Sequence, residues 1–188
     1  MIHRLQTIML LFAVSIFSAG CSMMAPQYTA SLDNVQNLRD AGAYAAKVGV
    51  FESNADKDNA NPISLRGSSL ASPYQNSYGN YVAEAIKQEL SLAEKLSPNS
   101  GVEISGAVLK NDINIPAAGM GTASIEARFI VKTGGVLRYE QIKSVRHEFP
   151  SAFAGAVAIP RAAQEYPIAV QKLLGLLYSD RAFINSIK

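Results

Sequence analysis

The chain has 188 residues, a formal net charge of +2 at neutral pH, one cysteine, two histidines and no tryptophan. This length predicts one domain with at most a short appendage, and a hydrophobic fraction of 48% is enough to fill a buried core. The near balance of 17 basic and 15 acidic residues excludes the large basic excess of a general nucleic-acid-binding protein. The single cysteine excludes an intramolecular disulfide framework and every zinc site built from several cysteines.

The first twenty residues have the pattern of a bacterial signal peptide. His3 and Arg4 precede a mostly apolar run over 5–17, and the small residues Ser18-Ala19-Gly20 follow that run directly. A helix formed by the apolar run would span roughly 20 Å, which is less than the roughly 30 Å hydrocarbon core of a bilayer. We therefore predict a signal peptide over 1–20.

Cys21 follows these small residues at once, and the tetrapeptide Ser18-Ala19-Gly20-Cys21 resembles a bacterial lipobox. The resemblance implies that the Cys21 thiol receives diacylglycerol, that the signal is cut before Cys21, and that its new amino group is acylated with a chain such as palmitate. Two or three acyl chains anchor a protein stably, whereas one alone is marginal. A plain signal peptide with a chance cysteine and an uncleaved anchor are the alternatives.

The residue after the lipobox cysteine bears on the membrane that receives the protein. Enterobacterial sorting often retains lipoproteins with Asp at this position in the inner membrane, and this chain has Ser22 instead. The resemblance therefore implies the periplasmic side of the outer membrane.

The mature chain divides into a polar N-terminal segment and one domain. Residues 23–34 lack a sustained hydrophobic period, and Leu32, Val35 and Leu38 at three-residue spacing suggest a turn of helix over 31–41. We predict that 21–44 is a tether that carries the lipidated Cys21, with 45–188 as a single α+β domain. Within that domain the residue patterns predict a strand over 45–52, a long polar loop over 53–77, a helix over 78–96, strands over 102–115 (with a bulge near Leu109), 122–132 and 136–149, a helix from Pro160 onward and a last short helix capped by Ser179 or Asp180.

The turn between the last two strands can be tested by register. A two-residue turn at Gly134-Gly135 would place Val131 opposite Arg138, which mixes the apolar and polar faces. A three-residue turn over 133–135 places Val131 opposite Leu137, so we predict the three-residue turn. The element order β-α-β-β-β-α then predicts a two-layer α+β sandwich with a mainly antiparallel sheet, both helices on one face, and the other face relatively open.

The chain offers little catalytic equipment, and we predict that it is not an enzyme and has no catalytic residues. His147 is the one histidine left after removal of the signal, and no Gly-x-Ser-x-Gly motif is present to supply a nucleophile. Glu89 lies near the centre of the apolar face of the 78–96 helix and could act as a general acid if buried, but no second acid can be placed beside it. The roles of His147 and Glu89 are therefore left open.

We also predict no cofactor and no metal site. The segment 54–59 resembles the start of a calcium loop, yet either frame lacks the Gly at the sixth position and the Glu at the twelfth. Neither phosphate-binding glycine pattern occurs, and the glycines at 119, 121, 134 and 135 are those of turns.

Basic residues gather on the predicted hairpin over 122–149. Of these, Arg138, Lys143 and Arg146 are our predicted binding residues for an anionic lipid, a lipopolysaccharide or a glycan. Glutamates at 126, 140 and 148 interleave with the cations, so an ordinary salt-bridged face is the competing interpretation.

The mature chain as a whole is similar to small proteobacterial outer-membrane lipoproteins, including the YajG-like group. The likeness rests on the lipobox, the 78–96 helix, the run 151–156 that leads into 168–174, and the ending over 180–184. It implies a non-catalytic, lipid-anchored protein that faces the periplasm and binds a protein partner as an auxiliary subunit of an envelope assembly or transport complex. The alternative is a direct binder of lipid, lipopolysaccharide or peptidoglycan; no nucleic-acid partner is expected.

Overall fold

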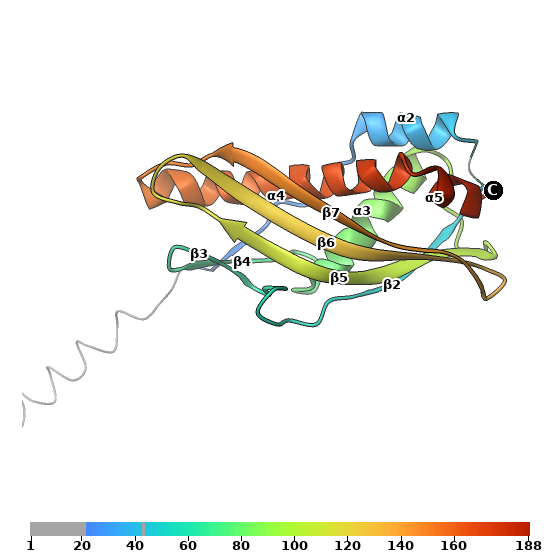
Figure 1. Cartoon of the computed structure of the whole chain (residues 1–188), viewed down its shortest axis with the longest axis horizontal. Helices are drawn as coiled ribbons and strands as arrows, with labels where there is room; N and C mark the ends of the chain where they lie inside the picture. The colour runs from blue at the N-terminus through green and yellow to red at the C-terminus, as the bar shows by residue number, and fades with distance from the viewer. Residues whose placement is uncertain (1–21, 43) are drawn as a thin grey trace, which may run out of the picture.

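A four-stranded sheet with the strand order β2-β5-β6-β7 forms one layer of the molecule (Figure 1). The computed structural model describes residues 22–42 and 44–188. The strands of this sheet are β2 (Lys47–Glu52), β5 (Val102–Asn114), β6 (Met120–Thr133) and β7 (Val136–Pro150). β2 runs parallel to β5, and the other neighbours are antiparallel. The parallel pair is possible because a helix crosses between the two strands.

Helices form the second layer and lie against one face of this sheet (Figure 1). They are α2 (Leu32–Asp40), α3 (Tyr78–Leu92), α4 (Gly155–Tyr178) and α5 (Arg181–Ser186). α3 contacts β2 and β5, α4 contacts β6 and β7, and α2 packs on α3 and α4. The α+β sandwich predicted from the sequence is therefore confirmed.

α3 begins where the sequence predicts and ends four residues earlier. The side chain of Ser77 accepts a hydrogen bond from Asn80 N–H, which caps the first turn. Gly79 lies directly against β2, since a Cβ atom there would come within 2.1 Å of the Phe51 carbonyl oxygen. The buried face of α3 consists of the apolar stripe predicted from its period, with Glu89 also fully buried.

α4 begins at Gly155, which is five residues before the predicted start at Pro160. Pro160 and Pro167 both lie inside the helix. Its buried residues recur at helical spacing and pack on the sheet, so tertiary burial outweighs the backbone hydrogen bonds that the two prolines cannot make. Of the two caps proposed for the last helix, Asp180 is the one that accepts from Ala182 N–H.

The register of the β6–β7 hairpin differs from the predicted one. The turn has two residues, Gly134 and Gly135, both with positive φ as a type I′ turn requires. Arg138 is then an extra residue in β7, which has no partner in β6. This bulge places Val131 opposite Tyr139, so that two buried side chains share one face of the sheet. The predicted three-residue turn was therefore wrong. The bulge inside β7, and not an extra turn residue, brings the apolar side chains of the two strands onto one face. The bulge predicted near Leu109 is confirmed.

A small second sheet lies beside the main one and uses segments expected to be irregular. It has the order β1-β4-β3, from β1 (Ser22–Met24), β3 (Ile63–Leu65) and β4 (Ser68–Ala71). β3 and β4 fall within the stretch 53–77, which the sequence predicts as a loop. β4 pairs with both β1 and β3, and these contacts between strands stabilise the small sheet. The strands themselves are too short to show a regular hydrophobic period.

The segment predicted as a tether folds onto the domain over its described residues. Tyr28, Val35 and Leu38 are buried, and the side chain of Ser31 caps α2 by accepting from Asn34 N–H. α2 confirms the turn of helix that the spacing of Leu32, Val35 and Leu38 suggests. Tyr28 lies in the stretch without a period, so the sequence did not indicate its burial. Among the helices of residues 22–42 and 44–188, none combines the length and apolarity needed to span a bilayer.

Candidate functional site

The three basic residues predicted to bind an anion do not share one surface. Cross-strand partners lie on the same face of a sheet, and Lys143 pairs with the buried Ala127 on the helix side. Arg146 pairs with Ser124 on the opposite face. Arg138 occupies the bulge near the β6–β7 turn. The hairpin thus distributes these cations, because alternation along β7 places residues three apart on opposite faces.

Lys143 is engaged in a contact that holds α5 on the sheet. Its ammonium lies 2.6 Å from Asp180 Oδ2, and the Tyr139 hydroxyl donates to the same oxygen at 2.9 Å. Burial acts to raise the pKa of Asp180, but the hydrogen bonds from Lys143, Tyr139 and Ala182 N–H outweigh it and hold that pKa at about 2. Lys143 therefore already has an anionic partner within the fold.

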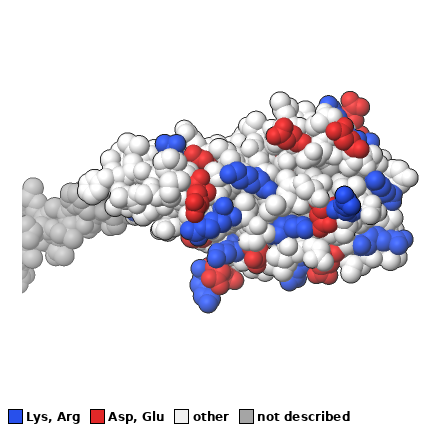
Figure 2. Space-filling view, turned by 45° about the horizontal axis from the view of Figure 1, so that its top comes forward, with Lys and Arg blue, Asp and Glu red and all other residues white. Residues whose placement is uncertain are grey.

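The outward face of the hairpin carries charges of both signs. Arg146 lies 3.6 Å from Glu148, and Arg128 lies 3.6 Å from Glu140 on the neighbouring strand. Figure 2 shows basic and acidic side chains interspersed over the charged part of this view. Exposed pairs of this kind contribute about 0–1 kcal/mol each, so they keep the surface soluble more than they stabilise it.

Among the predicted binding residues, Arg138 borders a hollow. The hollow has a volume of about 390 Å³ and lies between the β6–β7 turn and α5. Its lining is Thr133, Arg138, Ala182, Asn185, Ser186 and Lys188. Two cationic side chains with no acidic one make this hollow suited to a small anionic group.

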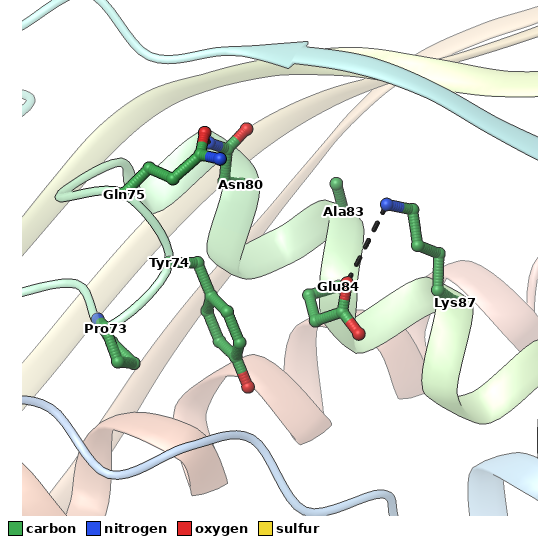
Figure 3. A pocket seen from close by; sticks show the side chains of 7 residues that line it. All are labelled: Pro73, Tyr74, Gln75, Asn80, Ala83, Glu84 and Lys87. Atoms are coloured by element: carbon green, nitrogen blue, oxygen red, sulfur yellow. Dashed lines mark hydrogen bonds and ion pairs between the residues drawn. The ribbon is translucent and has the colours of Figure 1, made fainter.

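A second hollow lies on the outer side of α3 and was not predicted (Figure 3). Its volume is about 360 Å³, and Figure 3 labels its lining residues: Pro73, Tyr74, Gln75, Asn80, Ala83, Glu84 and Lys87. Asn80 Nδ2 donates to Gln75 Oε1 at 3.1 Å, and Lys87 lies 3.7 Å from Glu84. The polar groups of the hollow thus pair with one another.

This hollow continues along α3 as an open groove. Glu84 and Lys87 also line the next hollow, which ends at the exposed side chains of Leu92 and Leu96. We call the whole surface from Pro73 to Leu96 the α3 groove. It combines a polar end with an apolar end, at which Leu92 and Leu96 are exposed. The sequence did not indicate this groove, because Leu92 and Leu96 fit the apolar face of the longer helix predicted over 78–96.

Glu89 is fully buried and organises the N-terminal segment. Its Oε1 accepts from the Tyr28 hydroxyl at 2.6 Å, from Ser31 N–H at 3.0 Å and from Asn34 Nδ2 at 3.1 Å. Burial raises the pKa of Glu89 above its ordinary value, while these hydrogen bonds lower it in part. Glu89, on the otherwise apolar face of α3, is thus a polar attachment point for Tyr28, Ser31 and Asn34, which lie 55 to 61 positions earlier in the chain.

His147 joins β7 to α4 through a separate network. Lys172 Nζ lies 2.8 Å from Nδ1, and Glu165 Oε2 lies 2.8 Å from Nε2. An ammonium has no lone pair and must donate, so Nδ1 accepts and Nε2 carries the hydrogen that Glu165 receives. Glu89 and His147 share no hydrogen-bond partner in this arrangement.

The segment that resembles a calcium loop has a structural arrangement of its own. Asp56 accepts from the N–H groups of Asp58 and Asn59, which lowers the pKa of its carboxyl. Asn59 donates to the carbonyl of Val108 and so fastens the loop to β5. Over residues 22–42 and 44–188, no three His, Cys, Asp or Glu side chains are grouped to hold a metal ion.

Cys21, the predicted lipidation site, lies outside the described residues. The next residue, Ser22, already belongs to β1 and pairs with Ser69 of β4. A lipid on Cys21 would therefore join the chain one residue from the folded domain, at most about 3.8 Å in Cα separation.

Comparisons with known proteins address the fold. No family model matches the chain, and no curated protein matches it by sequence. A Xanthomonas campestris protein of the DUF330 family model has a similar structure, with a TM-score of 0.60 at 11% identity over 87% of this chain and 95% of that one. A structure described as a candidate lipoprotein from Caulobacter crescentus gives a TM-score of 0.46 at 12% identity over 80% and 93%. The chain thus shares the fold of the DUF330 protein.

Proposed function

We propose that this chain is a lipid-anchored protein on the periplasmic side of the outer membrane, where it binds a protein partner in an envelope assembly or transport complex. The observation that carries the proposal is the lipobox Ser18-Ala19-Gly20-Cys21, which ends one residue before β1. A lipid at this place would hold the domain close to the bilayer surface instead of on a long tether. The binding role has no catalytic step.

The anchor is tested by labelling cells with palmitate and comparing the wild type with Cys21→Ser. The wild type should incorporate label and sediment with outer membranes in a density gradient. Cys21→Ser should lose the label completely and leave the membrane fraction or retain its signal peptide. Equal labelling of the two proteins, or label in the inner membrane fraction alone, would contradict the corresponding part of the proposal.

The α3 groove is the proposed contact surface for the partner. A photo-crosslinking residue in place of Lys87 samples the groove, and one in place of Arg128 samples the outward face of the sheet as a matched control. Crosslinking in cells at native expression should give one reproducible adduct from position 87 and none from position 128. No adduct from position 87 would remove the groove as the partner site.

Direct binding of an anionic ligand is a second candidate function, and the hollow beside Arg138 favours it. Lipopolysaccharide would supply phosphate groups for Arg138 and Lys188. Arg138→Ser should then weaken binding at low salt, whereas Arg146→Ser, on the opposite face beside Glu148, should not. Equal binding by both variants, or binding that does not depend on salt, would count against this function.

A further inference from the structure

One end of the molecule exposes apolar side chains on two segments that contain no charged residue. It is built from the β5–β6 loop over 115–120 and from 151–157, which lead into α4; we call these two segments the loop tip. Phe153 is 86% exposed, Val157 57% and Met120 49%. The sequence has no charged residue over 113–125 or over 149–160. In Figure 2 the end of the domain at the left of the view is almost entirely white.

The loop tip is held in a defined shape by Arg66. Its guanidinium donates to the carbonyl oxygens of Ile115 at 2.7 Å, Ala152 at 2.9 Å and Phe153 at 3.0 Å, and also to that of Pro116. A further contact, from Ser151 N–H to the Gly119 carbonyl at 3.0 Å, joins the two segments directly. Phe153 is therefore exposed on an ordered surface, because the backbone around it is fixed from both segments.

The described chain begins at this same end. Arg66 stands in the turn between β3 and β4, and Ser22 pairs with Ser69, three residues further along. Three residues of extended chain cover about 10 Å. Figure 1 shows β3, β4, the start of α4 and the β5–β6 loop gathered at the left end of the molecule. The β6–β7 turn and the C-terminus lie at the other end.

We infer that the loop tip inserts into the lipid surface of the membrane that carries the protein, with Phe153, Val157 and Met120 as the inserted side chains. The inference rests on the proposed lipid anchor, because the acyl chains on Cys21 would bring this end of the domain to the bilayer. Exposed apolar side chains, an aromatic one among them, enter the boundary between headgroups and acyl chains readily. The domain then stands with its long axis away from the membrane and presents the α3 groove and the Arg138 hollow to the periplasm.

A lipid surface explains the loop tip better than a protein partner does. Protein interfaces usually surround an apolar centre with polar and charged groups, and the two segments of the loop tip have no charged residue. The guanidinium of Arg66 borders these segments and donates its hydrogen bonds to their backbone carbonyls.

The absence of tryptophan allows a direct test with the full mature protein. Phe153→Trp introduces a single tryptophan at the loop tip, and Leu137→Trp introduces one at an exposed site beside the β6–β7 turn at the far end. Each lipidated variant is placed in vesicles of phosphatidylethanolamine and phosphatidylglycerol, with and without brominated acyl chains. Contact with these chains should remove about half of the Phe153→Trp emission, and Leu137→Trp should lose almost none.

Three outcomes separate the possibilities. Quenching of the loop-tip tryptophan alone supports insertion. Equal weak quenching of both variants in protein whose mass shows the lipid on Cys21 overturns the inference and leaves the anchor intact. A blue-shifted but unquenched loop-tip emission, which a second copy or another protein covering Phe153 would give, also overturns it. A failure of the anchor itself is recognised separately, since the mass of the purified chain would then lack the lipid.

Discussion

The Tyr28 hydroxyl donates a 2.6 Å hydrogen bond to the buried carboxylate of Glu89, and this contact fixes the N-terminal segment to α3. The N–H of Ser31 and the side chain of Asn34 donate to the same oxygen. Because Tyr28 follows Ser22 closely along the chain, the contact also sets where the proposed lipid meets the domain. Glu89 thus fixes the place at which the N-terminal segment joins the domain.

Tyr28→Phe should lower the free energy of unfolding by about 1–3 kcal/mol, because it leaves the buried Glu89 with one donor fewer. Urea denaturation of the two proteins measures the difference. Tyr44→Phe is the matched control, since Tyr44 is mostly exposed and its change should stay within about 0.5 kcal/mol. Equal effects of the two substitutions would show that the contact does not stabilise the fold.

The titration of Glu89 predicts a decline in stability as the pH rises. Burial raises the pKa of Glu89 in the folded chain, whereas the unfolded chain titrates near about 4.3. The folded state therefore holds its proton to higher pH, and the free energy of unfolding falls between about pH 4.3 and the raised pKa. Glu89→Gln keeps an acceptor oxygen and cannot titrate, so denaturation across this range should show no such decline. The same decline in Glu89→Gln would assign it to another group.

Asp180 predicts the opposite dependence in acid. Its pKa is about 2 in the folded chain and about 3.9 in the unfolded chain, so its contribution is present above about pH 4 and disappears as the pH falls toward 2. Asp180→Asn retains a cap for α5 but loses the charge that Lys143 contacts. Acid unfolding followed by circular dichroism should be less steep in this variant over that window. An unchanged acid transition would contradict the role of the pair.

Arg66 should control the order of the loop tip. Arg66→Lys cannot donate to four carbonyls at once, and limited proteolysis should then cut within 115–120 or 151–154. Arg66→Gly also removes the guanidinium but suits the positive φ of 46° at this position, which relieves about 1 kcal/mol. Both variants should be cut faster than the wild type. Resistance of Arg66→Gly equal to the wild type would show that backbone strain, not the guanidinium, is what matters there.

Gly79→Ala should destabilise the chain by more than about 2 kcal/mol, since the new Cβ would come within 2.1 Å of the Phe51 carbonyl oxygen. Gly155→Ala is the control in another helix, because its Cβ would meet only Ile159 Cδ1 at 3.7 Å. Thermal melts of the two variants compare the positions. A stable Gly79→Ala would mean that α3 and β2 can separate at little cost.

The elements that could be predicted are those whose hydrophobic pattern lies within one continuous segment of the chain. α3 and the three long strands have regular hydrophobic periods over many residues, and these periods located them to within a few positions. The hairpin register was missed because the bulge at Arg138 shifts the faces after the turn. A single inserted residue in a strand leaves no mark that differs from an ordinary polar position.

The candidate sites were less predictable, because they depend on contacts between distant segments. Glu89 was singled out by its place on an apolar face, but its partner Tyr28 lies 61 positions away in a segment without any period. Arg66 looks like an ordinary residue of a polar loop, and only the fold brings four carbonyl groups around it. Lys143 and Arg146 were grouped by their charge, and strand alternation separates them.

The mass of the intact chain purified from membranes tests the central claim most directly. We expect a chain that begins at Cys21 and carries a diacylglyceryl group and an additional acyl chain, with Cys21→Ser lacking all of this mass. A chain that begins at Met1, or one cut at another residue without added lipid, would contradict it.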